Sequence, residues 1–175
     1  MNYTHLDSRT RALMVSEIDA DIAAGTLYLS DNLSSAGKSK YAELLRSAAE
    51  SGNSATLAAQ LRSQLNSHEK PRLLKSGNYS KAPVMRSNAH EMLAEGEYTR
   101  FYMRAICLRA LEDGIAHVVV YRAKEVEKAR SESEQKIGQQ VSTQALLNDL
   151  RTSKGVDTAL GLPPGPNSGL AVKLS

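Results

Sequence analysis

A long apolar stripe between Ala89 and Glu112 limits the ways in which this chain can fold. Its apolar residues recur every three or four positions, which is the period of an amphipathic helix. Gly114 follows the stripe, where a chain commonly leaves a helix. Because so broad a face needs cover on several sides, the sequence predicts a central helix around which the core forms. The expected core face of this helix consists of Leu93, Tyr98, Phe101, Tyr102, Ala105, Ile106, Leu108 and Leu111.

Similar periodicity and capping signals predict further helices and one strand. The predicted helical segments are 8–24, 38–51, 53–65, an exposed charged helix over 125–140 that is interrupted at Gly138, and a short helix over 143–151. The β-branched run from Ile115 to Tyr121 predicts a strand. Its partner is left open between residues 27–29, part of the 72–84 segment, and an edge of a neighbouring subunit. We therefore expect a mainly α fold, a bundle of about four to five helices with a short β element.

Length and composition indicate one domain with an appendage. The chain has 175 residues, no Trp and one Phe, so its core must be built from small apolar side chains, as in helix packing. We divide it into a helical domain over 1–153 and an extended, Gly/Pro-rich C-terminal arm over 154–175. The single cysteine, Cys107, has apolar neighbours and is expected to be buried. Without an apolar signal region or membrane span, we expect assembly from the cytoplasm and no membrane contact.

The C-terminal arm is the first candidate binding segment. Its glycines and prolines exclude a regular helix, while the apolar residues between them distinguish it from a flexible linker. We therefore predict that the arm docks on another subunit or on a partner protein. A second interpretation, a proline-rich peptide ligand at residues 163–166, is weaker because the proline run is short. The predicted partner-binding residues of the arm are Val156, Leu160, Leu162, Pro163, Pro164, Pro166, Leu170, Val172 and Leu174.

The basic loop over 67–87 is the second candidate. Pro71, Gly77 and Pro83 prevent a long helix there, and a small hairpin is expected around Gly77. Five cations against the single acid Glu69 give a local excess of four positive charges, and Tyr79 lies among them. Three interpretations of this loop are open: it contacts phosphates, it contacts an acidic protein surface, or it is exposed to solvent without a partner. The candidate contact residues are Lys70, Arg72, Lys75, Tyr79, Lys81 and Arg86.

Catalytic signatures are missing from the sequence. It contains no phosphate-binding glycine loop, no nucleophile elbow and no zinc-ligand spacing. One histidine and three glutamates near the start of the central helix are candidates for an acid/base or metal-binding cluster. They are His90, Glu91, Glu95 and Glu97. Acidic side chains at that place complement the helix dipole, and Glu97 continues with Arg100 and Arg104 as an ordinary mixed-charge face. We therefore expect a protein that is not an enzyme and that has no cofactor and no metal.

Two segments resemble small proteins encoded in the structural-gene regions of tailed phages and prophages. These are Gly96–Ala105, which reads GEYTRFYMRA, and Leu160–Leu170, which reads LGLPPGPNSGL. The resemblance implies a helical virion component such as a head-tail adaptor, in which a helical body carries a long terminal arm. Its expected partners are copies of itself in a ring or shell and another virion protein, such as a portal or tail component.

The sequence thus leads to two expectations of function. The first is a non-catalytic structural protein of a symmetric assembly, located in a virion that is assembled in the host cytoplasm. The second is a nucleic-acid-binding regulatory protein that uses the basic loop over 67–87.

Overall fold

The computed structural model describes residues 1–152, 155–164 and 168–175. Within these ranges the chain is mainly helical, with a small three-stranded antiparallel sheet. The elements follow one another as α1 (Ser8–Ala24), α2 (Ser35–Ser51), α3 (Ser54–Leu61), α4 (Ala89–Glu112), β1 (His117–Arg122), α5 (Ser131–Lys136), β2 (Gln140–Ser142), α6 (Thr143–Thr152), α7 (Val156–Ala159) and β3 (Leu170–Leu174).

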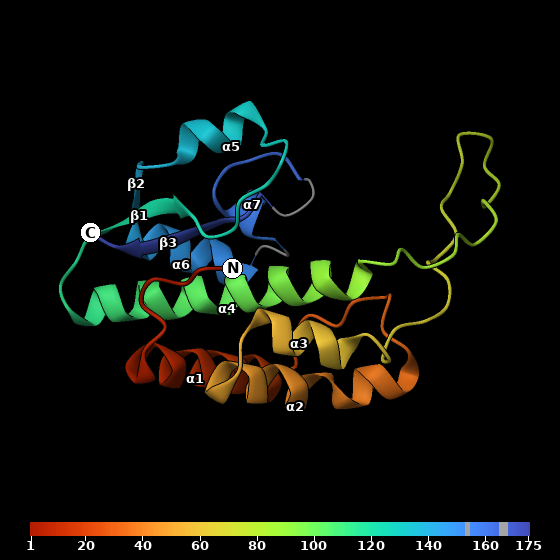
Figure 1. Cartoon of the computed structure of the whole chain (residues 1–175), viewed down its shortest axis with the longest axis horizontal. Helices are drawn as coiled ribbons and strands as arrows, with labels where there is room; N and C mark the ends of the chain where they lie inside the picture. The colour runs from red at the N-terminus through yellow and green to blue at the C-terminus, as the bar shows by residue number, and fades with distance from the viewer. Residues whose placement is uncertain (153–154, 165–167) are drawn as a thin grey trace.

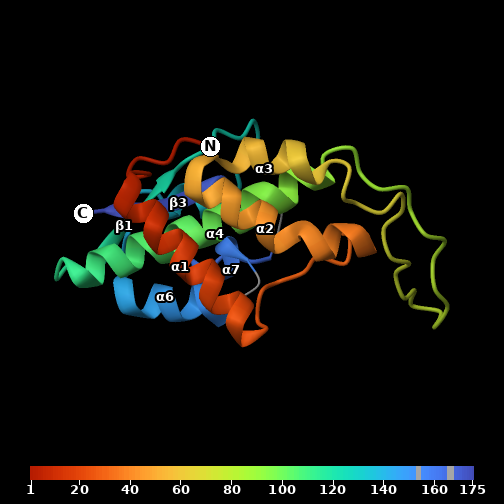
Figure 2. The same ribbon diagram turned by 90° about the horizontal axis from the view of Figure 1, so that it is seen from below.

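Helix α4 lies in the middle of the molecule, as its apolar stripe predicts. One layer, formed by α1, α2 and α3, packs on one side of α4, and the sheet with α6 and α7 packs on the other side (Figure 1). The view from below shows α1, α2 and α3 side by side across α4 (Figure 2). One continuous apolar core results, and it includes Phe101, Tyr102 and the buried Cys107. Among the described residues, no helix combines the length and the apolar character needed to cross a membrane.

Local capping explains where the first helices begin and end. Asp7 accepts a hydrogen bond from the backbone N–H of Thr10, and Gly25 ends α1 with a φ of 67°, as predicted. Helix α2 starts before the predicted Lys38 because Ser34 caps it by accepting a bond from the Gly37 N–H. A reciprocal capping box formed by Asn53 and Thr56 starts α3 directly after α2. The predicted helix pair is therefore present, although α3 ends at Leu61.

The partners of β1 are not those that the sequence suggested. Strand β1 lies between β2 and β3 and pairs antiparallel with both, in the order β2-β1-β3. Val118 faces Val141 on one side, and Val120 faces Val172 on the other. All three suggested partners are thus wrong. One neighbouring strand begins in the segment predicted as a charged helix, and the other comes from the predicted C-terminal arm.

The charged segment over 125–140 forms a much shorter helix than predicted. Only Ser131–Lys136 is helical, and the residues from Gln140 onward belong to β2. Gly138 has a φ of 82° and donates its N–H to the Val120 carbonyl, which turns the chain into the sheet. Pairing with β1 therefore overrides the helical charge pattern.

The expected extended C-terminal arm is also wrong for the described residues. Strand β3 forms the second edge of the sheet, and Asp157 at α7 accepts a hydrogen bond from Arg130 at 2.7 Å. Gly169, with a φ of 74°, allows the chain to approach Lys124 so closely that a Cβ would lie 2.2 Å from the Lys124 carbonyl oxygen. The apolar residues of the segment are covered by their own chain: Leu160, Leu162, Leu170 and Val172 are buried, whereas Val156 and Leu174 are partly buried.

Candidate binding hairpin

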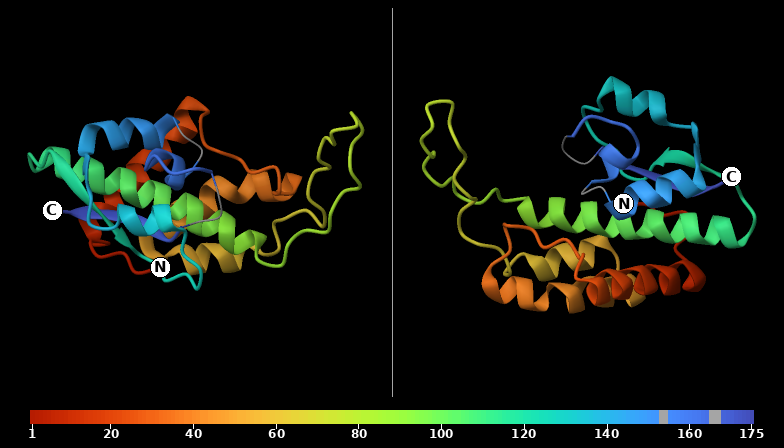
Figure 3. Two further views of the ribbon diagram at one scale, coloured as in Figure 1. Left: turned by 90° about the horizontal axis from the view of Figure 1, so that it is seen from above. Right: turned by 180° about the vertical axis from the view of Figure 1, so that it is seen from behind.

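Residues 67–86 form an irregular antiparallel hairpin, called the hairpin below, that projects from the helical body. It stands away from the packed layers in every view of Figures 1, 2 and 3 (Figure 3 gives the views from above and from behind). Isolated bridges join His68 to Val84 and Leu73 to Tyr79, and the Ser80 N–H donates to the Arg72 carbonyl at 2.8 Å. Gly77, with a φ of 82°, makes the turn that the sequence predicted.

The base of the hairpin is fixed to the connection between α1 and α2. The Asn66 side-chain amide donates to the carbonyl oxygens of Asp31 and Leu33 at 3.2 and 3.1 Å. Lys70 forms an ion pair with the Asp31 carboxylate at 2.8 Å. The hairpin is thus held at its base and exposes the rest of its length.

Ion pairs near the base neutralise much of the positive charge that the sequence shows. The Glu69 carboxylate accepts a hydrogen bond from Arg86 at 2.6 Å and lies 3.7 Å from the guanidinium of Arg72. With Lys70 paired to Asp31, the cations without an ion pair among the described residues of the hairpin are Lys75 and Lys81. Of these two, Lys75 lies two residues before the turn at Gly77 and Lys81 lies four residues after it.

Large apolar side chains are also exposed on the hairpin. Leu73, Leu74, Tyr79 and Val84 are 65%, 47%, 71% and 74% exposed, whereas only three other large apolar residues are exposed in the described part of the chain. Soluble proteins seldom gather such residues on one surface without a partner. We call Leu73, Leu74, Lys75, Tyr79 and Lys81 the tip patch. It combines apolar area with two unpaired cations.

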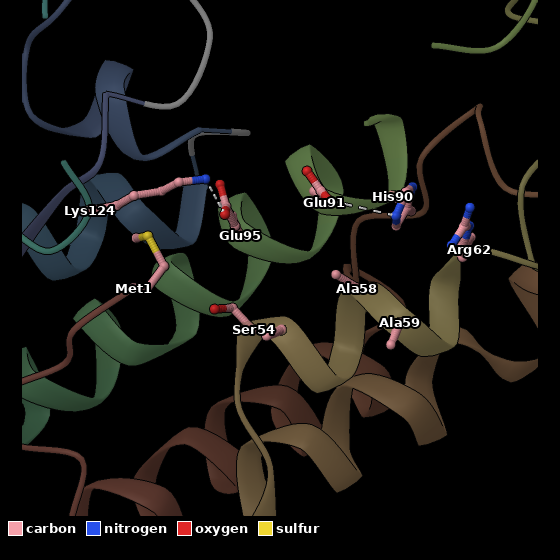
Figure 4. A pocket seen from close by; sticks show the side chains of 10 residues that line it. Met1, Ser54, Ala58, Ala59, Arg62, His90, Glu91, Glu95 and Lys124 are labelled. Carbon is pink, nitrogen blue, oxygen red and sulfur yellow. Dashed lines mark hydrogen bonds and ion pairs between the residues drawn. The ribbon is translucent and has the colours of Figure 1, made fainter. Parts of the chain in front are cut away.

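Three residues of the group at the start of α4, His90, Glu91 and Glu95, line an open pocket of about 520 Å³. Figure 4 shows Lys124 pointing toward Glu95 and His90 pointing toward Glu91. Lys124 forms an ion pair with Glu95, and His90 Nε2 lies 4.0 Å from Glu91 Oε1. Within the described ranges no group of three or more potential metal-binding side chains comes together. Glu97 does not join the pocket.

The mixed-charge face assigned to α4 is wrong, because its charged residues lie in the interior. Glu97, Arg100 and Arg104 are all buried. Arg104 donates to the Glu17 carboxylate at 2.7 Å and, through two nitrogens, to Asp21 at 2.7 and 2.9 Å. It lies 4.7 Å from the centre of the Phe101 ring. The apolar residues around Arg104 in the sequence were a signal for this burial, because they place it within the core face of the helix.

Helix α6 completes this buried network. Arg151 donates to Glu17 from two nitrogens, at 3.0 and 2.6 Å, so that Glu17 joins α1 to both α4 and α6. Burial by itself would raise the pKa of Glu17, but the hydrogen bonds and charges of Arg151 and Arg104 outweigh it and hold that pKa below its usual value. The network therefore has a structural role in joining three helices.

The two predicted contact surfaces have different outcomes. The basic loop residues Lys70, Arg72, Lys75, Tyr79, Lys81 and Arg86 are brought together on one projecting element. Four apolar residues of the predicted arm are instead buried in the core, and Val156 and Leu174 are partly buried. Pro163 and Pro164 are exposed, and Pro166 lies outside the described residues. Comparison of the chain with protein-family models, with curated proteins and with solved structures finds no match.

Proposed function

We propose that this protein is a non-catalytic component of a symmetric assembly and that the hairpin is its contact element. The observation that supports this most directly is the tip patch, whose three apolar side chains are 47–71% exposed. Full burial of a Leu or aromatic side chain contributes about 1.5–3 kcal/mol. Burying Leu73, Leu74 and Tyr79 in a partner groove is therefore a substantial source of affinity.

The charges of the tip patch suit a protein partner with acidic residues around an apolar groove. Lys75 directly follows Leu74 and Lys81 lies two residues after Tyr79, so an acidic rim on the partner would match their charge. A copy of the same chain, a portal and a tail component are the partners that the phage resemblance suggests. In this proposal the hairpin takes the role that the sequence suggested for the C-terminal arm, within a virion structural protein such as a head-tail adaptor.

Nucleic acid is the second candidate partner, favoured by the exposed Tyr79 and the two unpaired lysines. With two phosphate contacts the logarithm of the binding constant would fall with log salt with a slope of only about −2. Two phosphate contacts thus supply only a small electrostatic contribution to the affinity. Nucleic-acid binding with a slope of about −2 that is lost when Lys75 and Lys81 are neutralised would favour nucleic acid over the protein partner.

The test compares a tip variant with a matched surface variant in the full chain. Leu73→Ser with Tyr79→Ser removes apolar area from the tip, while Ile137→Ser removes an exposed apolar residue elsewhere. We expect the wild type and Ile137→Ser to be isolated in a large particle, as measured by its native mass, and the tip variant as a folded monomer. The proposal fails if the tip variant is incorporated normally or if the wild type occurs only as a monomer in its own cells.

A further inference from the structure

A second groove, of about 610 Å³, lies between the α1–α2 connection and the C-terminal end of α6. Two arginines from different helices line it, Arg100 of α4 and Arg151 of α6. The opposite wall is formed by residues 26–29 and Asp31 of the connection. Since Asp31 is paired with Lys70, its negative charge is already partly compensated.

Arg100 is buried but incompletely hydrogen-bonded. Its Nη2 donates to Glu97 at 2.7 Å, and its guanidinium lies 5.1 Å from the centre of the Phe101 ring. Its Nε atom is buried and has no hydrogen-bond partner among the described residues. A guanidinium offers five N–H donors, and a buried donor without an acceptor costs about 1–3 kcal/mol. Because Arg100 also lines the groove, an acceptor group bound there would contact this side chain.

The electrostatic balance around Arg100 favours a negative group. Burial raises the pKa of Glu97, the ion-pair partner of Arg100, to about 7. Near neutral pH the Glu97 carboxyl therefore carries less than a full charge, and the Arg100 cation is incompletely neutralised. Arg151 uses Nε and Nη2 for Glu17, and its Nη1 has no hydrogen-bond partner among the described residues. Two cationic donor groups thus line one groove.

We infer that this groove binds an oxyanion, a phosphate or a carboxylate group, between the guanidinium groups of Arg100 and Arg151. Guanidinium groups bind both kinds of oxyanion through paired, charge-assisted hydrogen bonds. The groove and the tip patch share no residue, so this inference does not depend on the function proposed for the hairpin.

Isothermal titration calorimetry on the full chain tests the inference, with inorganic phosphate and with acetate as separate probes at constant ionic strength in chloride buffer. We expect millimolar or tighter binding of at least one probe. Arg151→Gln and Arg100→Met should each weaken that binding roughly tenfold or more. Arg62→Gln, which changes an arginine of the pocket in Figure 4, should leave binding unchanged. Circular dichroism establishes that each variant is folded, and Arg151→Gln alone suffices if Arg100→Met unfolds.

The two probes distinguish the source of the oxyanion. Binding of phosphate alone indicates a phosphoryl group, whereas binding of acetate indicates a carboxylate, and either result supports the inference. The inference is overturned if the wild type binds neither probe at millimolar concentration. Equal affinity of folded Arg151→Gln and the wild type would overturn it as well.

Discussion

Replacing Arg104 by alanine tests the buried ionic network that joins α1, α4 and α6. The Arg104 side chain is 2% exposed and donates hydrogen bonds to Glu17 and Asp21. Alanine removes every one of these bonds and leaves two carboxylates with reduced neutralisation in the interior. Glu17 keeps its bonds to Arg151, but Asp21 loses both of its hydrogen bonds to Arg104.

The expected loss is large compared with the stability of a domain of this size. Removing one partner of a buried ion pair costs about 3–5 kcal/mol, because a buried charge stays without compensation. We expect about 3 kcal/mol, the lower end, since Arg151 still neutralises Glu17. Total stabilities of such domains are about 5–15 kcal/mol, so Arg104→Ala should remain folded but be clearly destabilised.

Urea denaturation followed by circular dichroism measures this loss, and Arg46→Ala is the matched control. Arg46 pairs with Asp19 between α2 and α1, but its side chain is 44% exposed, so its removal should cost less than about 1 kcal/mol. Glu17→Gln should cost less in the Arg104→Ala background than in the wild type, because the two residues interact. If Arg104→Ala and Arg46→Ala lower the free energy of unfolding equally, the buried network does not stabilise the fold as argued.

Three further predictions concern burial at other positions. Burial raises the pKa of Glu97 from 4.5 to about 7, so the folded chain holds a proton that the unfolded chain has lost. The free energy of unfolding should therefore fall by up to about 3 kcal/mol as the pH rises from 4.5 through 7, and urea titrations of Glu97→Gln should show this loss removed. Leu170→Ala should cost about 2–5 kcal/mol in thermal or urea unfolding, because Leu170 is buried in the core; a loss below 1 kcal/mol would contradict the folding of β3 onto its own chain. Burial raises the pKa of Cys107 to about 12, so a thiol reagent at neutral pH should label it only after unfolding; rapid labelling of the native chain would contradict its place in the core.

The helices of this protein could be predicted largely from local sequence. The ends of α1 and the whole of α4 agree with the periodicity and with nearby capping residues such as Asp7 and Gly25. Helix α6 was also predicted to within a residue. Such elements depend on hydrogen bonds and side-chain contacts between residues three or four positions apart, so the relevant information is contained in a short window of the chain.

Part of the candidate binding surface could be predicted from the sequence. The basic composition and the turn at Gly77 were visible in the sequence, but neither showed that Glu69 and Asp31 neutralise the cations near the base. The exposure of Tyr79 likewise depends on the hairpin standing away from the body. These properties depend on the spatial arrangement of residues far apart in the chain. Composition carries no information about that arrangement.

Only the tertiary structure decided the fate of the C-terminal segment and of the charges on α4. Leu170 and Val172 are apolar enough to require cover, but the sequence does not say whether that cover is another subunit or their own chain. Pairing of Val120 with Val172 settles it, because β1 needs a neighbour on its open edge and β3 provides one. The burial of Arg104 likewise depends on a contact between distant parts of the chain. Its partners Glu17 and Asp21 belong to α1, which packs against α4.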